Sequence, residues 1–293
     1  MKRPGYHPLL HGLLLFAAGA VNAGEPAAPP LPVWQTLEYE QRAFMVTARS
    51  RIELGATADD PLTWRLQAHS SVASNAEEVE LTLRAADGQA LRRERFSQGK
   101  DQRYKTYDYL PQMVVRERFD PPKNTSLPPA QWPLSSRREI PYPPLPAGTV
   151  VTDAYALLEL AGRFLDAEAA SAEVVVNTEF NFYLVKMSRS TGPAIEVEYR
   201  LASGETASGR RDTRGVSLEI SPLAEPDKPD FSLLGLHGAI TILFAGDQAL
   251  PLQLRGTAPR LGSAEINLRA ATLRPDAPGN PGPGRASAAE QGK

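Results

Sequence analysis

The sequence predicts a mainly β protein in which a large curved antiparallel sheet, a half-barrel, wraps around one long helix. Three observations lead to this fold class. Most periodic segments alternate between apolar and polar residues at every second position, which is typical of strands with one face in water. Only one long segment, 152–168, has apolar residues at helical spacing. Turn-forming residues separate the alternating segments, as in hairpins.

The N-terminal residues 1–23 predict a cleaved secretory signal. Lys2 and Arg3 precede an apolar run, and Val21-Asn22-Ala23 fits the small-x-small pattern before a cleavage site. The run is too short for a membrane span, which needs roughly 20 apolar residues. We therefore expect a periplasmic protein that has no membrane span after cleavage and continues with an extended linker over residues 24–32.

The composition constrains both the stability and the partners of the exported protein. The chain of 293 residues has no cysteine, so it offers no cysteine for lipid attachment and no disulfide, and core packing must stabilise it. Its 42% hydrophobic residues are enough for a substantial core. Loss of Lys2 and Arg3 changes the formal charge from −2 to −4, which disfavours nucleic acid as a partner.

The N-terminal part of the chain predicts a series of hairpin-linked strands. In the segment 44–54, apolar Ile52 and Leu54 alternate with Arg51 and Glu53. Asp87-Gly88 is a strong hairpin turn signal. The further expected strands lie at 62–68, 79–85, from 91 onward, 103–110 and 113–119.

A Pro-rich segment, 121–149, interrupts the strands. It contains nine prolines, which no helix or central strand accommodates. We expect an extended surface arm inserted into a single β-rich domain over residues 33–274. Two interpretations stay open for this arm: a lid or binding strap, or a plain connection that carries the chain across the sheet to the helix.

The expected helix follows the arm. Thr152 is the expected N-cap. Charged residues, among them Asp153 and Glu159, are expected on the face opposite to the apolar stripe. The apolar stripe contains Ala154, Leu157, Leu158, Ala161, Phe164 and Leu165.

The C-terminal part again predicts strands. Residues 174–185 alternate without interruption and predict the longest strand of the chain. Further strands are expected at 195–201, around Val216, and at 239–244, 250–255 and 264–270. Residues 275–293 are rich in Pro, Gly and Ala and are expected to be disordered.

From the helix onward the chain resembles a family of uncharacterised periplasmic proteins. Three features carry the resemblance: Asp153 opens the helix, the aromatic residues Phe180, Phe182 and Tyr183 follow it, and the segment ITILFAGDQALPLQLRG is similar to a closing hairpin. In that family the sheet wraps a helix in the manner of the lipoprotein carrier LolA and the receptor LolB. The resemblance implies a half-barrel and an exported location, and it implies no known reaction.

The residues point to no catalytic, cofactor or metal site. The expected mature chain has two histidines, His69 and His237, and no cysteine, so no local spacing predicts a zinc site. There is no Gly-rich phosphate loop and no G-x-S-x-G turn. A Ser-His-Asp triad assembled from distant residues stays an open alternative.

A basic region, 84–118, is the strongest charge feature. It has nine basic residues against five acidic ones and includes Tyr104, Tyr107 and Tyr109. Such a mixture could bind lipid phosphates or an anionic polysaccharide. The alternative is an exposed strand face whose charges discourage edge pairing.

The leading hypothesis is a non-enzymatic periplasmic binding or carrier protein with an apolar cleft between helix and sheet. The expected ligand is a lipid or acyl group or a hydrophobic protein segment, and the possible partners are a lipid, a lipoprotein or an envelope protein. Two alternatives are a cell-envelope interaction protein that uses the Pro-rich arm, and a hydrolase with an unrecognised site. The candidate cleft residues are Leu157, Leu158, Ala161, Phe164, Phe180 and Phe182.

Overall fold

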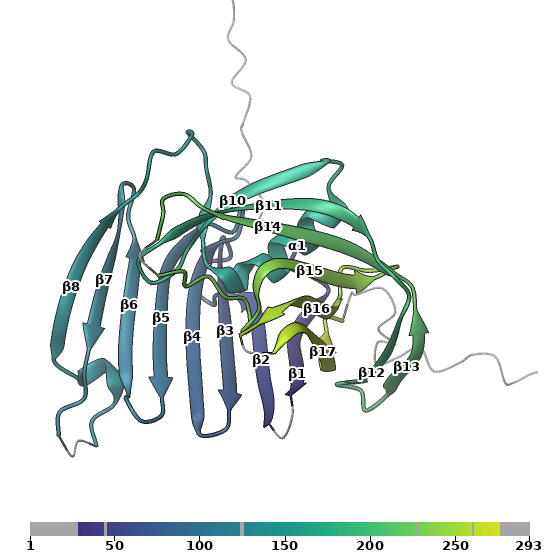
Figure 1. Ribbon diagram of the computed structural model, residues 1–293, viewed down its shortest axis with the longest axis horizontal. Helices are drawn as coiled ribbons and strands as arrows, with labels where there is room; N and C mark the ends of the chain where they lie inside the picture. Colours follow the sequence, from purple (N-terminus) through teal and green to yellow (C-terminus); the bar gives the residue numbers. More distant parts are fainter. Residues whose placement is uncertain (1–28, 44–45, 124–125, 227, 260, 276–293) are drawn as a thin grey trace, which may run out of the picture.

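The computed structural model confirms the predicted fold class. It describes residues 29–43, 46–123, 126–226, 228–259 and 261–275. In this part of the chain there is one sheet of seventeen strands and one α-helix (Figure 1). The predicted signal 1–23, most of the linker and almost all of the C-terminal tail lie outside the described residues.

The N-terminal half is a meander in which each strand pairs antiparallel with the next. The predicted turn at Asp87-Gly88 joins two of these strands, and Gly88 has a φ of 75°, which favours glycine. The strands are β1 (Trp34–Ala43), β2 (Val46–Ala56), β3 (Thr63–Val72), β4 (Asn75–Arg84), β5 (Ala90–Gln98), β6 (Arg103–Tyr109), β7 (Met113–Phe119) and β8 (Leu134–Pro141).

The C-terminal half continues the same sheet from the other side of β1. Strand β17 pairs with β1, and the ladder runs back through β16, β15, β14 and β11 to β10, which pairs parallel with the short β9. The hairpin β12–β13 joins β17 through a parallel contact. The strands are β9 (Val151–Thr152), β10 (Ser171–Asn177), β11 (Phe182–Thr191), β12 (Ile195–Leu201), β13 (Thr206–Arg211), β14 (Thr213–Pro222), β15 (His237–Ala245), β16 (Pro251–Ala258) and β17 (Gly262–Leu273).

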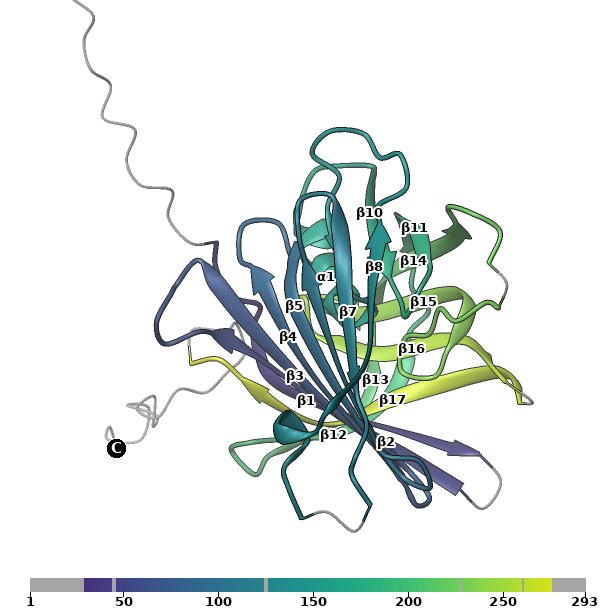
Figure 2. The same cartoon turned by 90° about the vertical axis from the view of Figure 1, so that its left-hand side faces the viewer.

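The curved sheet encloses the helix. Figure 2 shows α1 (Leu157–Asp166) between the β3–β8 part of the sheet and the strands β11, β14 and β15. Within the described residues, no backbone ladder joins β8 at one end of the sheet to β9 and β10 at the other. The architecture is therefore a half-barrel wrapped around a single helix.

The start of the helix differs from the prediction. Thr152 belongs to β9, and Asp153 is the cap, since its carboxylate accepts a hydrogen bond from the backbone N–H of Tyr155. A 3₁₀ turn, Ala154–Ala156, precedes α1. The predicted polar face is also wrong at Glu159, which is only 2% exposed. The sheet covers the helix on more sides than the apolar stripe suggests.

The predicted long strand 174–185 is a hairpin of β10 and β11. Asn177 pairs with Phe182, and the backbone N–H of Thr178 donates to the carbonyl of Asn181. The loop between them has four residues, an even number, so paired residues differ in parity: Val176 pairs with Tyr183 and shares a face with it. Apolar residues occupy both even and odd positions on each side of the loop, so the sequence shows no break in the alternation. The pattern therefore concealed a turn that the asparagines alone suggested.

The Pro-rich segment is only partly an extended arm. It contains a 3₁₀ turn, Pro129–Gln131, and strand β8, which pairs with β7. Pro133 precedes β8 and Pro141 is its last residue, so the prolines delimit the strand instead of excluding it. The strand lies at the edge of the sheet, where a missing N–H donor is tolerated.

Candidate functional site

The six residues predicted to line an apolar cleft lie in two different environments. Phe164 and Phe182, like the other residues of α1 in this set, belong to one continuous core. Phe180 lies instead in the β10–β11 turn and is 41% exposed. The fully buried members are Leu157, Leu158 and Ala161. The space between helix and sheet is filled by packed side chains.

A large cleft with a mixed polar and apolar lining lies on the concave face of the sheet, beside the start of the helix. Its volume is about 1060 Å³. Strands β1 to β5 form one wall, and the β10–β11 turn, the loop before β15 and the β16–β17 turn form the others. Hydroxyl and amide side chains line much of it, including Gln41, Ser50, Ser70, Asn75, Ser97 and Gln98.

Arg93, which is buried, forms the inner end of this cleft. Its Nη1 donates to Asp153 Oδ2 at 2.5 Å and to the carbonyl of Asn177 at 3.1 Å, and its Nη2 donates to the carbonyl of Thr178 at 2.5 Å. The guanidinium also lies 3.7 Å from the centroid of the Tyr107 ring. Burial opposes the charge, but Tyr109 and Asp153 outweigh it and raise the pKa of Arg93. Arg93 thus ties β5 to the helix start and to the β10–β11 turn.

Arg93 belongs to a row of cations on the concave face. The register pairs Arg93 with Tyr107 and Arg95 with Lys105, and the next ladder pairs Tyr107 with Arg116. Because alternate residues point to one face, these side chains share it. We call the set of Arg93, Arg95, Arg103, Lys105, Arg116, Arg118 and Arg138 the concave basic row.

The sequence contained a signal for this row. In RRERF the residues Arg93 and Arg95 alternate with Arg92 and Glu94, and the same alternation recurs at Arg103 and Lys105. The composition of 84–118 shows the excess of basic residues, and only the alternation shows their division between two faces. The structure therefore fits neither open interpretation completely, since some of these cations are exposed and others are buried in the concavity.

Acidic residues, some close in the chain and some distant, balance most of the row. Glu77 of β4 accepts from Arg95 Nε at 2.7 Å, and Asp120 accepts from Arg118 Nε at 2.9 Å. Glu179 of the β10–β11 turn accepts from Lys105. The pKa of Arg95 is raised because Glu77 outweighs the effect of burial. The concave face is thus rich in charges of both signs, with cations in excess.

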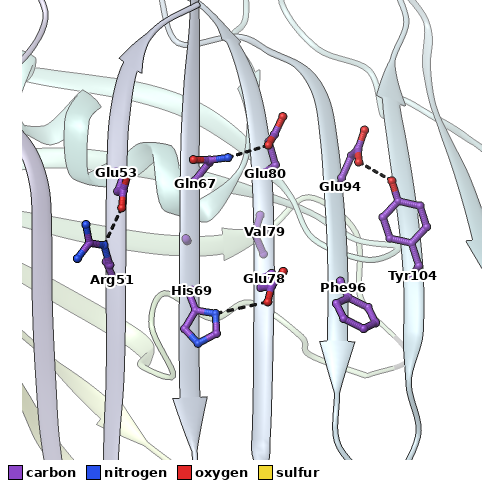
Figure 3. Close-up of a pocket in the computed structure, with 11 residues that line it drawn as sticks. Arg51, Glu53, Gln67, His69, Glu78, Val79, Glu80, Glu94, Phe96 and Tyr104 are labelled. Carbon is purple, nitrogen blue, oxygen red and sulfur yellow. Dashed lines mark hydrogen bonds and ion pairs between the residues drawn. The ribbon is translucent and has the colours of Figure 1, made fainter. Parts of the chain in front are cut away.

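The convex face of the same strands carries a shallower groove of about 370 Å³ (Figure 3). His69 Nδ1 lies 3.7 Å from Glu78 Oε1, and Arg51 Nε lies 2.6 Å from Glu53 Oε1. No serine is among the described residues that line this groove, so His69 and Glu78 do not form part of a Ser-His-acid triad there. These side chains are exposed and pair with their neighbours on the sheet.

The described residues show neither a metal centre nor a membrane-spanning helix. They contain no group of three or more His, Asp or Glu side chains placed to hold a metal ion. None of their helices is long and apolar enough to cross a membrane.

Comparison with known proteins identifies one similar structure and no family. No family model matches the chain, and no curated protein matches it. A crystal structure described as a beta-barrel-like protein of domain of unknown function DUF1849 from Brucella abortus is similar, with 10% sequence identity and a TM-score of 0.43. The similarity covers 83% of this chain and 98% of that one. A similarity of this strength establishes no function.

Proposed function

We propose that the protein is a non-enzymatic binding protein of the periplasm that holds a polar ligand in the concave cleft. The proposal rests on the difference between the helix–sheet interface and the concave cleft. The helix–sheet interface is packed, whereas the cleft has room for a ligand and presents hydroxyl, amide and charged groups. The exported location rests on the predicted signal at residues 1–23.

A polar ligand fits these surroundings better than the acyl group favoured by the sequence. An acyl chain in the helix–sheet interface would have to displace fully buried residues such as Leu157 and Leu158, at the cost of the packing they provide. A polar molecule in the cleft would exchange hydrogen bonds with water for hydrogen bonds with side chains such as Ser97 and Gln98.

The test is native mass spectrometry of protein purified gently from its own host. We expect a bound polar molecule on the wild-type protein. The variant Ser97→Trp fills the cleft from β5 and should lose that molecule. Thr82→Trp is the matched control, because Thr82 pairs with Arg65 and Arg92 on the convex face, and it should keep it. A bound lipid retained by both variants would contradict the proposal and favour the acyl carrier.

A second candidate is an interaction protein of the cell envelope, and the free edge of β8 favours it. Among the described residues β8 pairs only with β7, and Leu134 on it is exposed. An extended partner segment could add a strand there, although Arg137 and Glu139 on the edge discourage nonspecific pairing. A photo-crosslinking residue at Leu134 should then trap one partner in cells, while the same residue at exposed Leu62 should not.

A further inference from the structure

The β10–β11 turn places one carboxylate on two buried cations. Glu179 Oε1 lies 2.6 Å from Lys105 Nζ and 2.6 Å from Arg116 Nη2. The side chains of Lys105 and Arg116 are 9% and 4% exposed, and that of Glu179 is 26% exposed. The Glu179 carboxylate is therefore more accessible than Lys105 and Arg116, which lie behind it.

The cluster has more positive than negative charge. A third cation, Arg138 on β8, lies 5.0 Å from the centroid of the Phe180 ring, and Arg116 lies 4.7 Å from the same centroid. Within the described residues, no carboxylate lies within ion-pair distance of Arg138. Two cations thus share one carboxylate, and a third cation lies against the ring of the neighbouring Phe180.

Two further observations indicate that the cations lack acceptors. Arg116 Nε is buried and has no hydrogen-bond partner within the described residues, although buried donors are almost always paired. Burial lowers the pKa of Lys105 although Glu179 supports its charge. An additional negative charge would therefore be favourable at this point.

Hydrogen bonds to Asp230 hold the turn in place, whereas the Glu179 carboxylate is held by its ion pairs with Lys105 and Arg116. Asp230 accepts hydrogen bonds from Thr178 Oγ1 and Asn181 Nδ2, each at 2.8 Å, and from the Glu179 backbone N–H at 3.3 Å. Thr178 and Glu179 also line the cleft. A rotation of the Glu179 side chain alone would connect the cleft with Lys105 and Arg116.

We propose that Lys105, Arg116 and Arg138 bind a phosphate group of the ligand, and that the Glu179 carboxylate competes with that group for the same cations. This inference rests on the proposed binding function of the cleft and assigns its ligand a chemical class, a phosphate monoester. A dianion fits three cations better than a carboxylate does, and its oxygens accept the bidentate hydrogen bonds that arginine donates. The phosphate belongs either to a small soluble molecule or to a lipid headgroup.

The experiment is calorimetric titration of the full-length protein with inorganic phosphate, glucose 6-phosphate and vesicles that contain phosphatidic acid. Glu179→Gln removes the competing charge at constant size, and we expect about tenfold tighter phosphate binding. Lys105→Met and Arg138→Met should weaken it by a similar factor. Glu94→Gln is the matched control, because Glu94 also shares its carboxylate between two partners, Arg92 and Tyr104, on the convex face, and it should leave binding unchanged.

Unchanged or weaker phosphate binding in folded Glu179→Gln would overturn the proposal, as would no binding to either that variant or the wild type. If Glu179→Gln does not fold, the exposed Arg138→Met decides: unaltered affinity there overturns the proposal, and reduced affinity supports it. Glucose 6-phosphate binding more tightly than the vesicles identifies a soluble source, and the reverse identifies a lipid.

One variant separates the phosphate site from the binding function of the cleft. Ser97→Trp fills the cleft but leaves the cations in place, so it should abolish glucose 6-phosphate binding and retain that of inorganic phosphate. If no phosphate binds while Ser97→Trp still removes the molecule seen by mass spectrometry, the cleft binds a ligand of another class and only the phosphate site is wrong.

Discussion

Arg92 and Arg93 are neighbours on β5 and lie in opposite environments. The Arg92 side chain is 42% exposed on the convex face and pairs with Glu94, two residues away, and with Asp108 on the adjacent strand. The Arg93 side chain is 6% exposed and pairs with Asp153, 60 positions away along the chain. The charge of Arg92 is satisfied within the meander, whereas Arg93 and the Glu179 cluster hold distant segments of the chain together around the cleft.

The difference predicts different energetic roles for the two faces. Exposed ion pairs contribute roughly 0 to 1 kcal/mol because water and salt screen them. Removing one partner of a buried pair is far more costly, since the other charge is left without compensation. The concave pairs should therefore determine both the stability and the shape of the cleft, and the convex pairs should affect neither strongly.

The largest effect is expected from Arg93→Met. It leaves Asp153 and the carbonyls of Asn177 and Thr178 without their donor, and we expect a loss of about 3 to 5 kcal/mol in the free energy of unfolding. Arg92→Met should cost less than about 1 kcal/mol. Urea unfolding followed by tryptophan fluorescence measures both, because Trp34 and Trp64 are buried. Similar losses in the two variants would remove the distinction between the faces.

A smaller effect, with a pH dependence, is expected at Glu159. Burial, opposed by Arg163, raises the pKa of this carboxyl from its ordinary value of 4.5 to about 7. The folded state therefore keeps a proton that the unfolded state releases. The contribution of Glu159 to stability falls as the pH rises from about 4.5 to about 7, by roughly 3 kcal/mol in total.

Glu159→Gln should remove this dependence, so the variant should be as stable as the wild type near pH 5 and more stable at pH 8.

Asp87→Asn tests a pKa shift in the opposite direction, at an exposed ion pair. There burial is outweighed by Arg84, which lowers the pKa of Asp87, so the neutral variant should be less stable than the wild type at pH 8. Thermal unfolding across the pH range measures both, and a Glu159→Gln variant that is less stable at pH 8 would contradict the assignment.

The smallest effect is expected at Arg51 on the convex face. It pairs with Glu38 and Glu53, and all three side chains are about half exposed. Arg51→Gln should change the free energy of unfolding by less than about 0.5 kcal/mol, and 1 M salt should cancel even that change. Urea unfolding at low and high salt measures it. A loss comparable to that of Arg93→Met would show that the convex ladder is structural.

Local patterns predicted the sheet well and the site poorly. The alternation around Ile52 and Leu54 identified a strand whose inner face is buried, because a two-residue period is visible within a few residues. The contacts of Arg93 and Glu179 join segments far apart in the chain, and no local pattern encodes them. Phe180 fits the pattern of a strand because apolar residues continue at every second position through the turn, and Glu159 fits a solvent-exposed face because burial of a carboxylate is unusual.

The most direct test of the central claim is a crystal structure of the protein as purified from its own host. We expect ligand density in the concave cleft, between Ser97 and the β10–β11 turn. The core between α1 and the sheet should show closely packed side chains and no ligand. Density for an elongated apolar molecule between α1 and the sheet, with Leu157 and Leu158 moved apart, would contradict it.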